Sequence, residues 1–476
     1  MRDGVPDPAA LTLAAYSAGL RFDDLPDAVV DAARRHLLDT VGVAIRGREQ
    51  ANAINALRAV EAIDGAAGGV AVWGSERRLA SGYAALANGI AAHVLDFDDT
   101  HTDAIVHGSA ILAPVVLGLG EHLHSTGDDI VTAFVAGWEV AARVGLASRG
   151  TFHRRGFHTT SVAGVFGAAV AAARLLGLSA ERTAHALGLA GSQASGINEY
   201  LSNGSSAKAL HTGWSAHAGI VAARLAQAGM TGPMTVFEGR DGVLRTHGVP
   251  ERSDASALVA ELGTRFESTR VSIKPYPCCH FAHAFVDCAG ALVDRGIDAA
   301  SVTTLDCVVP QTEVGLICEP YAAKLAPATP YAAKFSLPFL IASRIVDGKI
   351  DHATFDEANL RRRELLDLAQ RVRYRVAAPG ETPFPRTFPG WVEASLSDGR
   401  RVVERLDVNA GHPDNPLSTD VVRAKFMTNA SGTLGEEAAL RLAEVVMALP
   451  ATTADELGRA LSTVPSSTTQ LRRKMS

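Results

Sequence analysis

Apolar residues recur at spacings of three and four positions through the first 265 residues, and this pattern constrains the fold more than any other feature. Such a spacing places apolar side chains along one face of an α-helix. It predicts helices at Leu11–Ala18, Leu25–Ile45, Leu79–Val94, Ala110–His122, Asp128–Ala147 and Thr160–Leu176. Ser179 is a typical N-cap for a further helix with its body at Arg182–Ala190. A short strand is predicted in this half at Gly69–Gly74.

The pattern changes near Arg265 to β-branched and alternating residues. Strands are predicted at Arg270–Ile273, Val302–Val309, Val372–Val376 and Trp391–Leu396. Ser397-Asp398-Gly399 predicts a hairpin turn, because glycine supplies the positive φ that such turns need. Helical patterns return at Ser418–Asn429 and Glu436–Leu449, and the closing segment 464–476 is basic and predicted to fray.

The order of these elements predicts a mostly α fold. We expect a large all-helical domain built from both chain ends, residues 1–269 and 409–476. A smaller α/β domain, residues 270–408, is expected to be inserted between them.

Composition excludes several classes of protein. A net charge of −6 and a pI of about 6.2 give no reason to expect a nucleic-acid partner. The longest stretch of small apolar residues, Ser161–Ala173, has 13 residues and is too short to span a membrane. Five cysteines without a CxxC pair form neither a secreted disulfide framework nor a structural zinc motif. The first thirty residues lack a signal-peptide pattern, so we expect a cytoplasmic protein.

The densest polar group is the acidic run Asp96-Phe97-Asp98-Asp99, followed by Thr100, His101, Asp103 and His107. Three carboxylates within four residues repel one another unless cations or hydrogen-bond donors compensate. One interpretation is a solvated acidic loop. A second is a metal site, since the run has the DxDD form of some terpene cyclases and Asp98, Asp99 and Asp103 resemble a magnesium-diphosphate motif. The 6% aromatic content is modest for a terpene pocket. A third is acid–base catalysis, in which the carboxylates orient neighbouring histidines and lysines.

Acid–base catalysis requires cationic partners, and three distant segments contain them. Arg149–His158 holds three arginines and two histidines before an apolar helix, where a helix start favours anions. Asn203–Gly213 holds Lys208, and Ile273–His280 holds Lys274 with Cys278 and Cys279. Taken singly, each has an ordinary explanation as a structural histidine, a surface lysine or a buried cysteine.

Four ordered blocks of the sequence together resemble one family, along nearly the whole chain. They are Leu95–His101 with His107–Glu121, then Arg155–Leu178, Ala207–Pro233 and Ile273–Asp287. These blocks resemble the MmgE/PrpD family, which includes 2-methylcitrate dehydratase, cis-aconitate decarboxylase and iminodisuccinate epimerase. The resemblance implies a helical domain with a smaller α/β lid domain, a homodimer, and an active site between the two domains that needs no metal or cofactor.

The resemblance also implies site residues. The positions that match the family's active site are Asp96, Thr100, His107, His158, Lys208 and Lys274. Cys278 falls where the epimerase-type members use a thiol. Thr159 stands after Gly156-Phe157-His158 where the family often has proline. Phe339 stands where decarboxylase-like members often carry tyrosine, which removes a hydroxyl group and argues against decarboxylation.

The expected chemistry is formation of a carbanion or enediolate beside a carboxylate, stabilised by preplaced cations and donors. Lys208, helped by Arg155, would hold a substrate carboxylate, and Lys274 or His158 would stabilise the enediolate or move the proton. His107, oriented by Asp96, would be the opposing acid–base group.

Four functions follow from this interpretation. The leading one is a hydro-lyase on a 2-methylcitrate-like polycarboxylate. The alternatives are an epimerase of an amino- or imino-dicarboxylate, in which Lys274 and Cys278 would trade a proton, a cis-aconitate decarboxylase-like enzyme, and a dimeric scaffold without turnover.

Overall fold

The computed structural model describes residues 7–65, 68–202, 205–384 and 387–463. These residues form two compact units. The first unit runs up to Val271 and resumes at Ser418, and the second runs from Ser272 to Leu417. The first unit is almost entirely helical and the second contains a sheet, which confirms the predicted mostly α fold class.

The helices of the first unit come from both ends of the chain. From the N-terminal part they are α1 (Ala9–Gly19), α2 (Asp27–Gly47), α3 (Ala51–Asp64), α4 (Ser81–His93), α5 (Ser109–Leu123), α6 (Gly127–Ser148), α7 (Thr151–Arg154), α8 (Thr159–Leu175), α9 (Ala180–Gly191), α10 (Ala207–Gln227) and α11 (Val243–Thr246). From the C-terminal part they are α18 (Thr419–Leu434), α19 (Glu436–Met447) and α20 (Ala454–Leu461). Short 3₁₀ helices are η1 (Phe22–Asp24), η2 (Asn198–Ser202), η3 (Pro250–Arg252), η4 (Ala255–Leu258) and η5 (Glu267–Thr269).

The centre of this unit is a group of apolar helices that pack pairwise, among them α4, α5, α6, α8 and α10. Every residue of α8 from Thr159 to Ala173 is buried. Among the described residues, α6 is the one helix long and apolar enough to cross a membrane, and 94% of its most apolar stretch is buried inside the protein. A helix at the centre of a folded core has the same composition.

Helices α4 and α10 approach each other through two facing glycines. A Cβ atom on Gly89 would lie 2.8 Å from the Cα of Gly213, and a Cβ on Gly213 would overlap the carbonyl oxygen of Leu86. Only glycine allows this close crossing. The crossing places the C-terminal end of α4 and the N-terminal part of α10 in the same region of the unit, where the polar residues described below meet.

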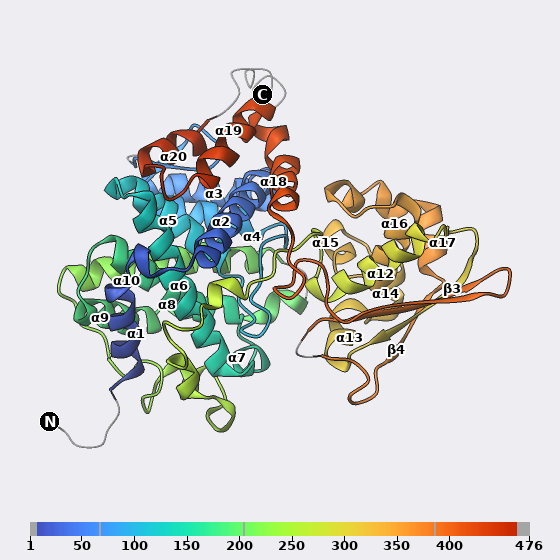
Figure 1. The fold of residues 1–476 in the computed structure, drawn as a ribbon, viewed down its shortest axis with the longest axis horizontal. Coiled ribbons are helices and arrows are strands. Elements are labelled where there is room, and N and C mark those ends of the chain that lie inside the picture. Colours follow the sequence, from blue (N-terminus) through green and yellow to red (C-terminus); the bar gives the residue numbers. More distant parts are fainter. Residues whose placement is uncertain (1–6, 66–67, 203–204, 385–386, 464–476) are drawn as a thin grey trace. The chain divides into compact units, whose positions relative to one another are not determined.

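The C-terminal segment completes the unit, with α18 packed along α2 (Figure 1). The Lys425 ammonium group on α18 lies 2.7 Å from the Asp39 carboxylate on α2 and donates a 2.9 Å hydrogen bond to the Phe97 carbonyl. The same ammonium group lies 3.8 Å from the centre of the Phe97 ring, which is a cation–π contact.

The second unit is an α/β unit. Its strands β3 (Val302–Val309), β4 (Val372–Val376), β5 (Gly390–Leu396) and β6 (Arg401–Leu406) pair in the order β4-β3-β5-β6. Strands β3 and β4 are parallel and the other pairs are antiparallel. The helices are η6 (His280–Ala282), α12 (His283–Asp294), α13 (Gln311–Ile317), α14 (Tyr321–Leu325), α15 (Pro330–Ala333), α16 (Leu337–Asp347), η7 (His352–Phe355), η8 (Asn359–Arg361) and α17 (Arg363–Ala369). Helix α12 packs on β5 and β6 and against α16 around an apolar core of its own (Figure 1).

Two strand predictions need correction. The predicted strand Arg270–Ile273 is wrong: in the part of the chain that the structure describes, these residues belong to no strand, and Ser272 alone forms an isolated β-bridge. The strand predicted at Gly69–Gly74 is reduced to β1 (Val70–Ala71), which pairs with β2 (Arg78–Leu79). The predicted basic tail lies outside the described residues.

Candidate active site

The acidic run lies in a tight loop between α4 and α5. Asp96 has a positive φ of 55°, a strained conformation for a residue with a side chain. Reciprocal backbone hydrogen bonds between His101 and Val106 close the loop. Leu95 and Phe97 pack with Val43 in the apolar core, which leaves the three carboxylates to find polar partners.

Each of the three carboxylates has a different partner from a different helix. Asp96 accepts a 2.7 Å hydrogen bond from the Lys208 ammonium group on α10. Asp98 lies 2.7 Å from Nδ1 of His93, the last residue of α4. Asp99 lies 2.8 Å from Nδ1 of His36 on α2. A second oxygen of Asp99 accepts from the backbone N–H of Ser109, the first residue of α5, where the helix dipole favours a negative charge.

His107 follows the acidic run and is held by its Nδ1 atom. This nitrogen lies 2.8 Å from the carbonyl oxygen of Asp99, 3.0 Å from the Thr100 hydroxyl oxygen and 3.6 Å from a carboxylate oxygen of Asp98. A carbonyl oxygen can only accept, so Nδ1 of His107 carries the hydrogen. In the neutral ring, Nε2 therefore holds the lone pair and is the atom that can take a proton.

A second pair of imidazoles faces this loop. His158 is the N-cap residue of α8, and its Nδ1 lies 3.0 Å from Nδ1 of His211 on α10, so the two rings share one hydrogen. The His158 ring is 5.7 Å from that of His93 and 6.2 Å from that of His107, centre to centre. The Tyr200 ring contacts both His158 and His211.

Burial and mutual repulsion keep this pair neutral. Burial, with the neighbouring His93 and Lys208, holds the pKa of His158 well below its usual value. The same causes lower the pKa of His211 to about 4. Both rings are therefore neutral near pH 7 and offer N–H donors rather than positive charge.

A buried network of ion pairs around Glu267 holds the loop through His101. Glu267, fully buried, accepts from Nε2 of His101 at 3.0 Å and from the Arg143 guanidinium at 3.1 Å. The Arg265 guanidinium also pairs with it at 2.7 Å. Burial opposes ionisation of Glu267, but the bond from His101 and the pairing with Arg265 outweigh it and lower the pKa to about 2.

The structure gathers five of the residues proposed from the sequence. Asp96, Thr100, His107, His158 and Lys208 lie in this one group in the first unit. The carboxylate that lies beside His107 is Asp98, whereas Asp96 pairs with Lys208.

Three other proposed residues are placed differently. Arg155 is exposed, and its guanidinium lies 3.5 Å from the Gly248 carbonyl oxygen. Lys274 and Cys278 belong to the second unit, where both side chains are buried. Phe339 is also buried in that unit, on α16.

Sequence reasoning missed His93, His211 and the role of Asp98 as a partner for two imidazoles. Both histidines had a local signal. His211 lies three residues after Lys208, and on a helix this spacing puts both side chains on one face. His93 is the last residue but one of the predicted helix Leu79–Val94, three residues before Asp96 and the acidic run.

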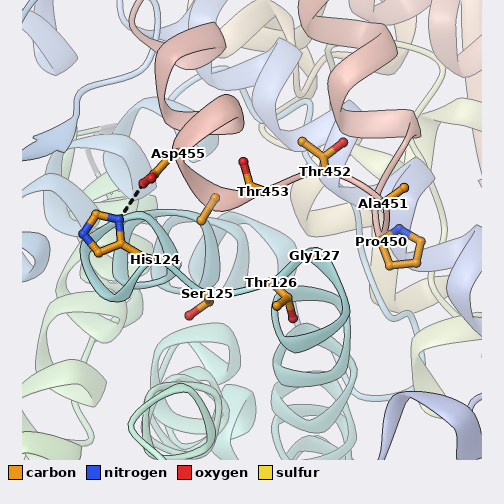
Figure 2. Close-up of a pocket in the computed structure, with 10 residues that line it drawn as sticks. His124, Ser125, Thr126, Gly127, Pro450, Ala451, Thr452, Thr453 and Asp455 are labelled. Carbon is orange, nitrogen blue, oxygen red and sulfur yellow. Dashed lines mark hydrogen bonds and ion pairs between the residues drawn. The ribbon is translucent and has the colours of Figure 1, made fainter.

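A surface cavity of about 370 Å³ lies elsewhere in the first unit, where residues 124–127 meet residues 450–455 (Figure 2). Its polar groups are threonine and serine hydroxyls and an ion pair of 2.7 Å between His124 and Asp455. The residues that line it include no lysine or arginine, so it does not suit a substrate with several carboxylates.

Comparison with known proteins gives two family matches and several relatives. The MmgE/PrpD N-terminal domain matches residues 11–253, and the MmgE/PrpD C-terminal domain matches residues 276–450. The cis-aconitate decarboxylase of Homo sapiens is 28% identical over 436 residues, which cover 90% of this chain and 89% of the human protein. That of Mus musculus is 28% identical over 439 residues, covering 90% and 88%. That of Aspergillus terreus is 25% identical over 452 residues, covering 91% of each chain.

Proposed function

Because this chain belongs to the MmgE/PrpD family, we propose that it is a lyase that acts on a small polycarboxylate by moving a proton beside a carboxylate group. The observation that carries the proposal is the gathering of four imidazoles, a lysine and two carboxylates from α4, α8, α10 and the acidic loop. We further propose that Lys274 takes part in the reaction, as the family resemblance implies, and that the protein is a homodimer.

The reaction removes a proton from carbon and leaves a carbanion conjugated with a carboxylate. This intermediate is too unstable in water unless donors are already in place where its charge develops. The neutral rings of His158 and His211 can donate N–H hydrogen bonds to the developing negative charge. Lys208 supplies the positive charge that would hold a substrate carboxylate.

His107 is the group best suited to take the proton. Its Nδ1 hydrogen is directed at the Asp99 carbonyl, so the lone pair of the neutral ring lies on Nε2, the nitrogen that would take the proton. In a dehydration, the C–H bond on one carbon and the C–O bond on the next both break, a carbon–carbon double bond forms, and the departing hydroxide takes a proton and leaves as water. Lys274 is the proposed acid that supplies this second proton.

Two reactions compete within this class. Dehydration of a 2-methylcitrate-like substrate is our leading proposal, because Phe339 lacks the hydroxyl group that the decarboxylase-like pattern carries at that position. Decarboxylation of cis-aconitate is the second candidate, because the relatives described above have that activity.

The test is a panel of citrate, 2-methylcitrate, cis-aconitate and aspartate-derived acids, each assayed with EDTA present. Dehydration gives an alkene absorbance and no carbon dioxide, whereas decarboxylation releases carbon dioxide. Incubation in D₂O detects an epimerase, which exchanges its α-hydrogen without releasing water. Turnover of none of these acids by the folded protein would refute the proposed function.

Substitutions then test the assignment of residues. His107→Gln and Lys274→Ala should each lower kcat on the true substrate by about 10² to 10⁴, the usual contribution of an acid–base group. The control is His122→Gln, an exposed histidine on α5, which should leave kcat unchanged. Folded variants of His107 and Lys274 with near-normal activity would show that the assignment is wrong.

A further inference from the structure

Three potential metal ligands in the first unit lie unusually close together. Asp98 is central: one of its carboxylate oxygens is 2.7 Å from Nδ1 of His93 and 3.6 Å from Nδ1 of His107. One donor atom from each of the three residues lies within 4.8 Å of the other two. The side chains of His93 and Asp98 are fully buried, whereas that of His107 is 13% exposed.

The types of these donors select one class of ion. Imidazole nitrogens are ligands of intermediate softness that suit Zn²⁺, Cu²⁺, Ni²⁺ and Fe²⁺, whereas Mg²⁺ and Ca²⁺ prefer sites made of oxygen alone. Two imidazoles and one carboxylate are also a common set of three protein ligands around zinc. The remaining acidic groups of the run are already paired, Asp96 with Lys208 and Asp99 with His36.

We propose that His93, Asp98 and His107 form a binding site for a divalent transition-metal ion such as Zn²⁺, and that the bound ion inhibits the enzyme. The proposed reaction uses proton transfer alone, so this ion would act as an inhibitor and not as a cofactor. The inhibitory part of the inference rests on the proposed function of His107, whereas the binding part does not.

Inhibition follows from the tautomers of the imidazoles. A metal ion takes the lone pair of a nitrogen, so coordination at Nδ1 of His107 moves its hydrogen to Nε2. The ring stays neutral and no proton leaves the site. Nε2, which we propose to accept the substrate proton, then has no lone pair. The positive ion beside Asp98 also raises the cost of a protonated His107.

Direct binding tests the site without reference to any substrate. The full-length protein, stripped with EDTA and dialysed, is titrated with zinc chloride against a chromogenic chelator, and with cobalt chloride while visible absorption is recorded. We expect the unmodified protein to bind one ion. The His93→Gln variant should bind it more weakly by at least about 10–100-fold, because loss of a residue that only supports a metal ligand already costs about that much affinity. Cobalt bound by nitrogen and oxygen ligands should give d–d bands that the variant lacks.

The chain provides a matched control on its surface. His124 and Asp455 lie 2.7 Å apart, the same spacing as His93 and Asp98, but they form no three-donor group with another described residue (Figure 2). His124→Gln should leave the tight zinc site intact. If His93→Gln fails to fold, as judged by circular dichroism, His107→Gln replaces it because that side chain is partly exposed. Equal zinc affinity in the unmodified protein and in the folded variant would overturn the proposal.

An activity assay separates the two parts of the inference. Once the substrate is known, zinc should inhibit turnover at the concentration at which it fills this site, and EDTA should restore it. Binding without inhibition would show that His107 is not the proton acceptor, while leaving the metal site in place. Inhibition that His93→Gln does not relieve would show that zinc acts elsewhere.

Discussion

At the scale of single residues, Glu267 connects the acidic loop to the core and makes its stability depend on pH. Three donors hold its carboxylate ionised, from His101, Arg143 and Arg265. Its pKa in the folded protein, about 2, lies below its ordinary value of 4.5. The group therefore stabilises the fold fully above pH 4.5, and this contribution is lost as the pH falls from about 4.5 towards 2.

Glu267→Gln should destabilise the protein by about 3–5 kcal/mol at pH 7, because it leaves buried Arg143 without one of its charged partners. Chemical denaturation at pH 7 and pH 3.5 measures the effect. The difference in the free energy of unfolding between the unmodified protein and the variant should be smaller at pH 3.5, where ionised Glu267 contributes less to stability. A difference that does not change with pH would contradict this account.

The sequence predicted that the acidic run needs cationic or hydrogen-bonding partners, but not which residue pairs with which carboxylate. Three adjacent carboxylates need compensating groups, and the structure supplies Lys208, His93 and His36. Their identity depends on how α2, α4 and α10 cross, which no local pattern specifies. The sequence interpretation assigned Asp96 to orient His107, but Asp98 lies beside that ring because the loop reverses direction at Asp96, where φ is positive.

At the scale of elements, the crossing of α4 and α10 decides whether the site forms. His93 lies at the end of α4, and Lys208 and His211 lie in the first turns of α10. The facing glycines Gly89 and Gly213 set the distance between these helices.

Gly213→Ala should push α4 and α10 apart, because the added methyl group would overlap the Leu86 carbonyl oxygen. We expect a loss of about 1–3 kcal/mol of stability, as for other overpacked cores, and a larger loss of activity than the stability change alone would give. The control is Gly432→Ala on α18, where a Cβ meets open space and stability should rise by up to about 1 kcal/mol. Thermal melting and kcat measure both, and equal effects at the two glycines would refute the role of the crossing.

Helix α10 also carries exposed apolar side chains. Leu210, Trp214 and Leu225 lie on one side of the helix, at spacings of four and eleven residues, and are 47%, 42% and 37% exposed. Exposed apolar groups that cluster on one face mark interaction surfaces. We propose that this face of α10 forms the homodimer interface.

Trp214→Lys should convert a dimer into a monomer and lower activity, because α10 carries both the interface and the site. Sedimentation velocity measures the oligomeric state. Leu440→Lys, an equally exposed leucine on α19, is the control and should leave the dimer intact. A monomeric unmodified protein, or a Trp214→Lys variant that stays dimeric, would show that this face has another role.

Most elements could be predicted because their apolar periodicity is strong. The predicted helices that became α2, α4, α5, α6 and α8 begin and end within two residues of their observed bounds. Ser179 and Ser418 act as helix caps, and Gly399 has the expected positive φ between β5 and β6. Helix α3 was not predicted from the sequence. Only two of its residues, Ala53 and Val60, are buried, so its sequence has little apolar periodicity.

At the scale of the whole molecule, the two ends of the chain share one helical unit. Lys425 joins the C-terminal segment to Phe97, 328 residues away, and to Asp39. Burial raises the pKa of Asp39 to about 6, and Lys425 opposes this rise. The ionised carboxylate is therefore stable in the core only while the lysine is present.

Lys425→Met should cost about 3–5 kcal/mol of stability near neutral pH, since it leaves a buried charge unpaired. A folded-state pKa above the ordinary value favours folding at low pH, and this advantage is lost as the pH rises through the folded pKa. The variant should therefore lose more stability at pH 8 than at pH 5. Adding Asp39→Asn should remove this pH dependence, as measured by urea denaturation, and a persistent dependence would point to another group.

The order of elements was enough to predict the fold class, because helical patterns return after the strands near the C-terminal end. Nothing in the sequence of 418–463 says which earlier helix it joins. That pairing comes from a buried lysine on α18 and a buried aspartate on α2, and both look like ordinary surface charges when the sequence is read alone.

The division of the acidic run among three helices also bears on the route by which the chain folds. A compact intermediate that buried residues 96–99 before α2 and α10 had docked would hold three like charges in apolar surroundings, so such premature collapse is disfavoured. The run thus imposes an order of assembly, with the helices first and the loop last. Added salt, which screens like charges, should accelerate refolding in stopped-flow measurements, and a rate independent of ionic strength would speak against this order.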